Sequence, residues 1–133
     1  MKGVSALPVI LLVSMIILEL AIAVALTASS LSNTFYGERM ASEALSAARA
    51  GAEDAIIRVI RYKNCPTTGC PASYTVTVGS RTADVTIASD GSGHITINST
   101  GAAFTRKKKV QVILGVNSST GEVKLQSFAE VAL

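Results

Sequence analysis

The stretch GERMASEALSAARAGAEDAIIRVI, residues 37–60, decides the fold because it fixes what the rest of the chain can pack against. It contains no proline, and its apolar residues recur at steps of three and four, which predicts an amphipathic helix. The predicted apolar face, continued to the next turn, consists of Ala41, Ala44, Ala48, Ala52, Ala55, Val59 and Tyr62. Because most of these side chains are small, we expect the packing partner to approach the helix backbone closely.

Two glycines, Gly37 and Gly51, interrupt this helical pattern. Each costs about 1 kcal/mol relative to alanine in a helix interior. Gly37 follows a run of serine, asparagine and threonine at residues 29–34, so it marks the expected bend or local unwinding of the helix.

The N-terminal segment is apolar over residues 4–28, where Glu19 is the only ionisable side chain. As a helix this run would be about 37 Å long, enough to cross a hydrocarbon core of about 30 Å. A helix buried in a soluble core is the alternative, but such helices rarely lack a polar face over so long a run. We therefore expect a transmembrane segment at residues 4–28 and an amphipathic continuation at residues 29–62, both in one helix.

Charges on either side of the apolar run set its expected orientation. Lys2 and the terminal amine precede it, whereas Glu38, Arg39 and Glu43 follow it. This bias places the N-terminus in the cytoplasm and the rest of the chain outside.

Cys65 and Cys70 enclose the sequence PTTG, and their presence agrees with an oxidising compartment. Structural zinc sites need four ligands, and the sequence has no further cysteine. A redox-active pair usually has two intervening residues rather than four. The spacing therefore favours a local disulfide that pins the loop between helix and sheet, with a redox-active pair as the alternative.

After residue 64 the apolar period changes to two, which predicts four to five short strands. Their apolar faces are Tyr74, Val76 and Val78; Ala83, Val85 and Ile87; Ile95 and Ile97; Val110, Val112, Leu114 and Val116; and Val123 and Leu125. Gly79 and Ser80 form a predicted hairpin turn between the first two strands. The apolar side of such a sheet must be covered, and the alanine-rich apolar face of the predicted helix (the alanine face) can cover it. The sequence thus predicts an α+β fold, with the long N-terminal helix packed on an antiparallel sheet in residues 63–133.

The dense charge run of the chain consists of Arg106, Lys107, Lys108 and Lys109. It fits a nucleic-acid-binding patch, an electrostatic contact to a neighbouring subunit, or a solvated strand edge whose lysines discourage aggregation. Alternation puts Lys107 and Lys109 on the face opposite Val110, so we expect these two to be exposed. No aromatic residue interleaves with the run, which weakens the nucleic-acid interpretation.

Nothing in the sequence resembles a catalytic site. There is no set of nucleophile, base and orienting group, no glycine-rich phosphate loop and no cluster with metal-ligand spacing. His94 stands alone in a predicted strand, and we expect it to face solvent. We therefore expect a protein that is not an enzyme and that holds neither a cofactor nor a metal.

A tiny basic leader ending in Gly3, an apolar helix that starts at once, an amphipathic continuation and a C-terminal antiparallel sheet resemble a type IV pilin or pseudopilin. The stretch at residues 37–60 is similar to the helix of the PilX-like minor pilins. Their alanine-rich pattern A-x-x-A-A-x-A-G is matched here by Ala44, Ala47, Ala48, Ala50 and Gly51. The resemblance covers the layout of the whole chain and is specific in the first sixty residues.

The resemblance implies that a prepilin peptidase removes residues 1–3 and that Val4 becomes an N-methylated terminus. Glycine at the cut suits a protease that binds extended backbone, because it has no side chain to clash. The apolar helix then stays on the mature protein and packs against other pilin subunits, with the inner-membrane pilus assembly machinery as a further partner. The chain would lie in the inner membrane before assembly, and in a cell-surface or periplasmic filament afterwards.

One position departs from the family pattern. Pilins usually carry glutamate at the fifth mature position, where it pairs with the terminal amine of a neighbouring subunit, but here that position is Pro8. Glu19 lies about 16 Å further along a helix and is a poor substitute. We expect Glu19 to make a polar contact at membrane depth, with a carboxyl lacking any special partner as the alternative. Proline at this position indicates a minor subunit at the tip or in the initiating complex.

Two other classes of function stay open. One is a single-pass anchored extracytoplasmic binding or adhesion domain that never polymerises, and the other is a secreted enzyme or inhibitor released after signal cleavage. The mature N-terminus discriminates among the three, because Val4 indicates a pilin, Met1 an anchored domain and a start beyond residue 28 a secreted one.

Overall fold

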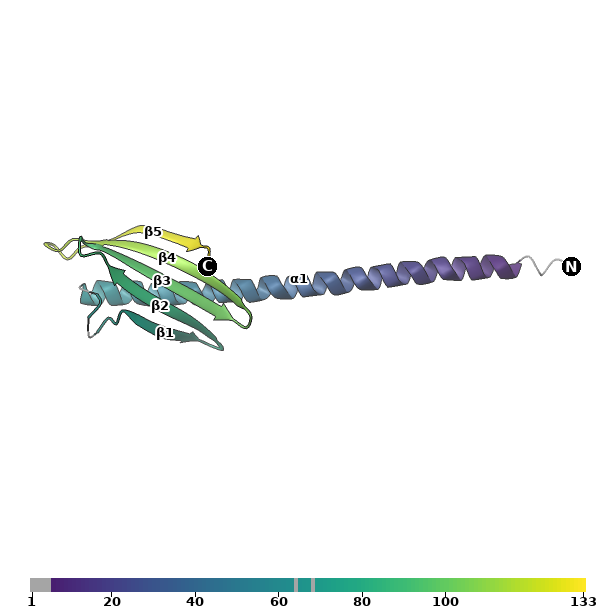
Figure 1. Cartoon of the computed structure of the whole chain (residues 1–133), viewed down its shortest axis with the longest axis horizontal. Coiled ribbons are helices and arrows are strands. Elements are labelled where there is room, and N and C mark those ends of the chain that lie inside the picture. Colours follow the sequence, from purple (N-terminus) through teal and green to yellow (C-terminus); the bar gives the residue numbers. More distant parts are fainter. Residues whose placement is uncertain (1–5, 64, 68) are drawn as a thin grey trace. The chain divides into compact units, whose positions relative to one another are not determined.

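The chain forms one long helix followed by five antiparallel strands (Figure 1). The computed structural model describes residues 6–63, 65–67 and 69–133. The elements are α1 (Ala6–Tyr62), β1 (Ser73–Val78), β2 (Arg81–Ser89), β3 (His94–Ala103), β4 (Arg106–Val116) and β5 (Val123–Val131). The α+β class, the end of the helix and the position of every strand agree with the sequence prediction. The chain divides after Gly37 into two compact units, which are described separately.

The first unit is the N-terminal part of α1, and its residues 7–36 are all exposed. Residues 29–37 are helical throughout, so the local unwinding predicted at Gly37 is wrong. Hydroxyls in and beside the polar run bond back to the preceding turn, a hydrogen bond that is compatible with a continuous helix. Thr27 and Thr34 each donate to the carbonyl four residues earlier, at 2.8 and 3.1 Å.

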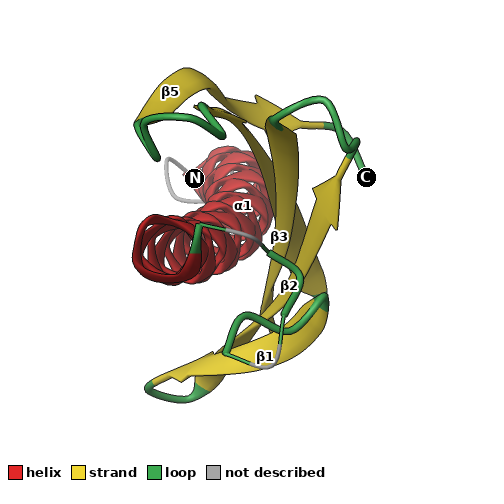
Figure 2. Cartoon of the chain, turned by 90° about the vertical axis from the view of Figure 1, so that its left-hand side faces the viewer, coloured by secondary structure: helices red, strands yellow, loops and turns green. Residues whose placement is uncertain are grey.

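In the second unit the rest of α1 lies against the concave face of the sheet, whose order is β1-β2-β3-β4-β5 (Figure 2). The buried apolar side chains of the helix are Met40, Ala44, Ala47, Ala48, Ala52, Ala55 and Val59. They meet buried side chains of the three central strands, namely Ala83, Val85, Ile87, Ile95, Ile97, Ala103, Val110, Val112 and Leu114. The alanine face is therefore the cover that the sheet needed.

The buried face of the helix is wider than the predicted stripe. Met40 and Ala47 are buried, although the sequence pattern did not include them, because a curved sheet covers a broader arc of the helix than a flat one. Ala41 is only partly buried. Tyr62 is 43% exposed, so its assignment to the core face was wrong. Its ring instead lies over Gly69, where a β-carbon would be 2.3 Å from a ring carbon.

Two glycines allow the helix and the sheet to pack closely against each other. A β-carbon on Gly101 of β3 would lie 2.0 Å from the carbonyl oxygen of Ala44 and 2.5 Å from the amide nitrogen of Ala48. On the helix, a β-carbon on Gly51 would lie 2.6 Å from the hydroxyl oxygen of Ser99. Gly51 is therefore a contact point rather than an interruption, and the predicted close approach to the helix backbone is confirmed.

The edge strand β5 departs from the predicted pattern. Val123 packs against the core, but Leu125 remains 59% exposed although its pairing partner Leu114 is buried. Phe128, which pairs with Val112, is 41% exposed. One helix is only about 10–12 Å wide, so it covers the three central strands and leaves the apolar side of this edge open.

Candidate interaction surfaces

The predicted site residues lie in three separate parts of the chain. Pro8 and Glu19 lie on the N-terminal part of α1, the two cysteines follow its C-terminal end, and the basic run begins β4. Gly3 and Val4, the residues of the expected cleavage, lie outside the described residues.

The N-terminal part of α1 is long and apolar enough to cross a membrane, which is compatible with membrane anchoring. Pro8 lies in the first described turn of α1, and Glu19 is exposed. A shallow apolar groove follows along the helix, lined by Leu20, Ala23, Val24, Thr27, Ala28 and Leu31. The Thr27 hydroxyl is bonded to the helix itself, so the groove presents methyl groups and small side chains to a partner.

The loop after the helix contains the predicted disulfide between Cys65 and Cys70, with α-carbons 5.5 Å apart. Both residues are buried and belong to the same core cluster as Val59. Thr67 and Cys70 exchange backbone hydrogen bonds of 2.8 and 3.0 Å, which close the loop into a tight turn. The disulfide therefore joins the end of α1 to the core rather than standing free at the surface.

Replacing both cysteines, Cys65→Ala and Cys70→Ala, should lower the free energy of unfolding by about 2 kcal/mol, because even a short cross-link restricts the unfolded chain. Urea denaturation of the full chain in detergent measures the change. Reductant should shift the midpoint of the natural chain towards that of the double variant and leave the double variant unchanged. Equal midpoints for the oxidised natural chain and the variant would show that the bridge contributes nothing.

A second contact joins α1 to edge strand β1. Arg58 donates from Nε to Asp54 at 2.7 Å, and its guanidinium carbon lies 4.4 Å from the ring centre of Tyr74. Burial, aided by the nearby Asp54 carboxylate, raises the pKa of the Tyr74 phenol, and the hydrogen bond that Arg58 donates to Asp54 raises the pKa of Arg58. This cation–π contact holds β1 against the helix, and nothing in its geometry suggests a reaction.

A third contact holds the start of β2. The Glu43 carboxylate accepts a hydrogen bond from Arg81 Nε at 2.9 Å and one from Arg39 Nε at 3.2 Å. The Arg81 side chain, ahead of that of Arg39, holds the pKa of Glu43 below its usual value. A sequence pattern could suggest the pair with Arg39, four residues away on the helix, but not the pair with Arg81, which is 38 residues away.

Acid should therefore destabilise the second unit, residues 38–133 (the head), by protonating Glu43. Its pKa is lower in the folded protein than the ordinary 4.5, so the pair contributes stability above that pH and loses it as the pH falls through the lowered pKa. Glu43→Gln should flatten this part of the pH dependence in urea denaturation between neutral and acidic pH. Glu122→Gln, at an exposed carboxylate 3.4 Å from Lys124, is the matched control. If Glu43→Gln and the natural chain lose stability in parallel on acidification, the assignment to Glu43 is wrong.

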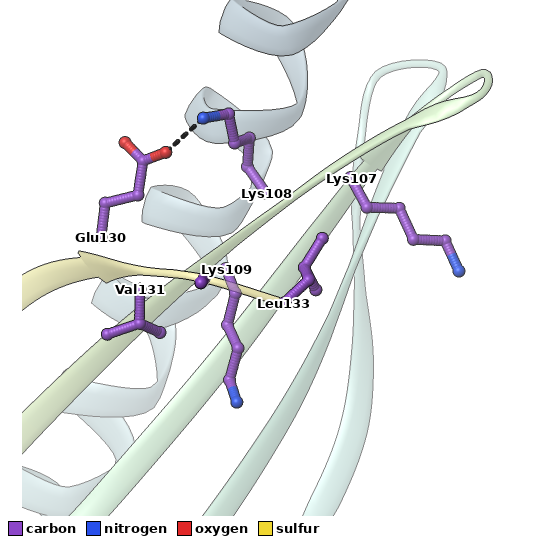
Figure 3. Close-up of a pocket in the computed structure, with 7 residues that line it drawn as sticks. Lys107, Lys108, Lys109, Glu130, Val131 and Leu133 are labelled. Atoms are coloured by element: carbon purple, nitrogen blue, oxygen red, sulfur yellow. Dashed lines mark hydrogen bonds and ion pairs between the residues drawn. The ribbon is translucent and has the colours of Figure 1, made fainter.

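The basic run places its side chains on both faces of β4 (Figure 3). Lys107 and Lys109 lie on the outer face, with Lys107 exposed and Lys109 partly so, in agreement with the predicted alternation. Lys108 points to the helix side and forms an ion pair with Glu130 of β5. A shallow hollow lies here, lined by Lys107, Lys108, Lys109, Glu130, Val131, Ala132 and Leu133.

The turn before the basic run contains an aromatic residue that the sequence interpretation passed over. Phe104 forms the β3–β4 turn with Thr105, directly before Arg106, and it is 79% exposed. No aromatic residue interleaves with the basic run, but this ring lies directly beside it. The signal was present in the sequence, since Phe104 lies between two predicted strands where a turn residue would be polar.

No family model matches the chain, and neither a curated protein nor a solved structure matches it.

Proposed function

We propose that this chain is a minor subunit of a type IV pilus or a type II secretion pseudopilus, inserted by its apolar helix after removal of residues 1–3. The observation that carries the proposal is the single unbroken helix Ala6–Tyr62. Its first part exposes an apolar surface, and its second part supplies the alanine face of the head. A plain membrane anchor needs no such continuity, since any flexible linker can join it to a soluble domain.

Other pilin subunits are the proposed partners of the apolar segment. Ala23 and Thr27, two small residues four apart, lie in the groove between Leu20 and Leu31, and such pairs let apolar helices approach closely in a bilayer. A prepilin peptidase and the inner-membrane assembly machinery act on the chain before assembly. The subunit then moves from the inner membrane, N-terminus in the cytoplasm, into a cell-surface or periplasmic filament.

Pro8 supports a minor rather than a repeated subunit. A repeated subunit must bury its terminal amine against a neighbour in apolar surroundings, and an unpaired charge there costs several kcal/mol. A chain with proline at this position cannot neutralise the subunit ahead of it. Its own amine, at Val4, can still be met by the glutamate of another pilin. The proposed place is therefore the tip or the initiating complex, with no catalytic role.

Quantitative mass spectrometry of sheared filaments tests this place. We expect this chain at low copy number, in filaments made mostly of a different pilin that carries the glutamate. Pro8→Glu should leave assembly intact and raise the copy number of the chain. If the natural chain is the dominant component, the tip assignment is wrong. If it is absent from filaments but present in membranes, the anchored binding domain is the better account.

A further inference from the structure

The turn between β3 and β4 carries a bulky side chain that the geometry of a two-residue hairpin disfavours. Ala103 pairs with Arg106, so Phe104 and Thr105 alone make the turn. Phe104 has φ of 52°, a left-handed conformation that favours glycine, asparagine or aspartate over a bulky side chain. Its ring belongs to no core cluster among the described residues and is 79% exposed. The phenyl group is therefore placed in solvent at a cost in folding, which suggests a ligand outside the fold.

Positive charge follows this exposed ring along β4. Arg106 and Lys107 follow the turn directly and are exposed, and Lys109 is on the same outer face as Lys107. Of the basic run, only Lys108 forms an ion pair within the described part of the chain. The hairpin tip, meaning the β3–β4 turn and the basic residues that follow it, thus combines one exposed aromatic ring with three cations that have no acidic partner among the described residues. This combination is complementary to an anionic surface with an apolar layer beneath it.

The tip lies at the end of the head where its helix begins. Strand β3 runs opposite to α1, because Ser99 meets Gly51 whereas Gly101 meets Ala44 and Ala48. Continuing in the same direction brings Phe104 to the Glu38 end of the helix in this unit. Only residues 29–37 separate that end from the apolar segment, a connection of about 14 Å if helical and about 30 Å at full extension. This connection keeps the head tethered within about 14 to 30 Å of a bilayer that holds the apolar segment.

We propose that this hairpin tip docks the unassembled head on the anionic lipid surface of the membrane that holds the chain. Phe104 enters the headgroup region, and Arg106, Lys107 and Lys109 contact lipid phosphates. The inference rests on the membrane insertion in the proposed function but not on filament assembly. A single-stranded nucleic acid fits less well, because one ring cannot stack on successive bases.

The chain has no tryptophan, so Phe104→Trp introduces a unique fluorescent probe at the tip. The full chain is reconstituted into vesicles of phosphatidylcholine alone or mixed with phosphatidylglycerol, with brominated acyl chains as quenchers. We expect quenching at least about twofold stronger in the anionic vesicles, with a blue-shifted emission that salt reverses. The matched control probe is Ser118→Trp, in the exposed loop at the other end of β4. Its fluorescence should not be quenched in either kind of vesicle.

Charge removal tests the electrostatic part. Arg106→Gln with Lys107→Gln, on the Phe104→Trp background, should lower the ratio of docked to free head at least tenfold, since each cation near an anionic surface contributes about fivefold. Lys124→Gln, at an exposed lysine of β5, should leave the ratio unchanged.

Flotation of the chain with neutral vesicles separates membrane insertion of the apolar helix from docking of the hairpin tip. A chain that does not float overturns membrane insertion and the docking together. A chain that floats while position 104 stays unquenched, or is quenched equally in neutral and anionic vesicles, overturns the docking alone. An emission shift caused by single-stranded oligonucleotide but not by anionic lipid also overturns it and assigns the tip to nucleic acid.

Discussion

Gly101→Val should lower the free energy of unfolding of the head by about 3–5 kcal/mol, the largest stability change that we expect from a single substitution. A β-carbon here would lie 2.0 Å from the Ala44 carbonyl oxygen and 2.5 Å from the Ala48 amide nitrogen. Both are backbone atoms of a helix and cannot rotate away as a side chain can. The layers would have to separate, which would loosen the contacts between the alanine face and the three central strands.

The control is Gly115→Ala, one residue before the end of β4. Its nearest neighbour would be the terminal amide nitrogen of the Gln126 side chain, at 2.6 Å, which can move. We expect this variant to stay within about 1 kcal/mol of the natural chain. Urea denaturation followed by circular dichroism compares the two. Similar small losses for both variants would mean that helix and sheet are not packed as closely as described here.

Replacing Gly3 by leucine should abolish entry of the chain into filaments, the largest functional effect that we expect. A bulky side chain beside the expected cut would clash with a peptidase that binds extended backbone, so the precursor should accumulate in the membrane. Immunoblots of membrane and sheared-filament fractions measure both forms. The disulfide between Cys65 and Cys70 should still form in the variant, since both cysteines lie more than sixty residues from the expected cut. Normal maturation of the leucine variant would rule out the proposed leader.

Local patterns predict most of the fold because each element carries its own period. The end of α1 at Tyr62 coincides with the loss of the helical repeat, and the strands coincide with alternation. What local patterns cannot predict are contacts between distant segments. The roles of Gly51 and Gly101 emerge only when β3 is laid across the helix.

The partner of Lys108 shows the same limit of local patterns. With a regular register from Val116 and Val123, Glu130 would lie on the outer face of the sheet. A shift between Ile113 and Leu114 moves it by one residue, so it pairs with Val110 on the helix side and reaches Lys108. One extra residue in a strand reverses every face beyond it, and no periodicity in the sequence marks its position.

The sequence pattern did not predict the exposed ring of Phe104, for a different reason. The turn at Phe104 and Thr105 lacks the glycine, asparagine or aspartate that usually marks a two-residue hairpin. Alternation predicted which lysines face outward, but the exposure of the ring beside them depends on its left-handed backbone.

The most direct test of the proposed filament subunit is the intact mass of the chain extracted from membranes. We predict a mass for residues 4–133 with one added methyl group on Val4 and two hydrogens fewer, for the disulfide between Cys65 and Cys70. A chain that still begins at Met1, or one that begins beyond residue 28, would contradict the account.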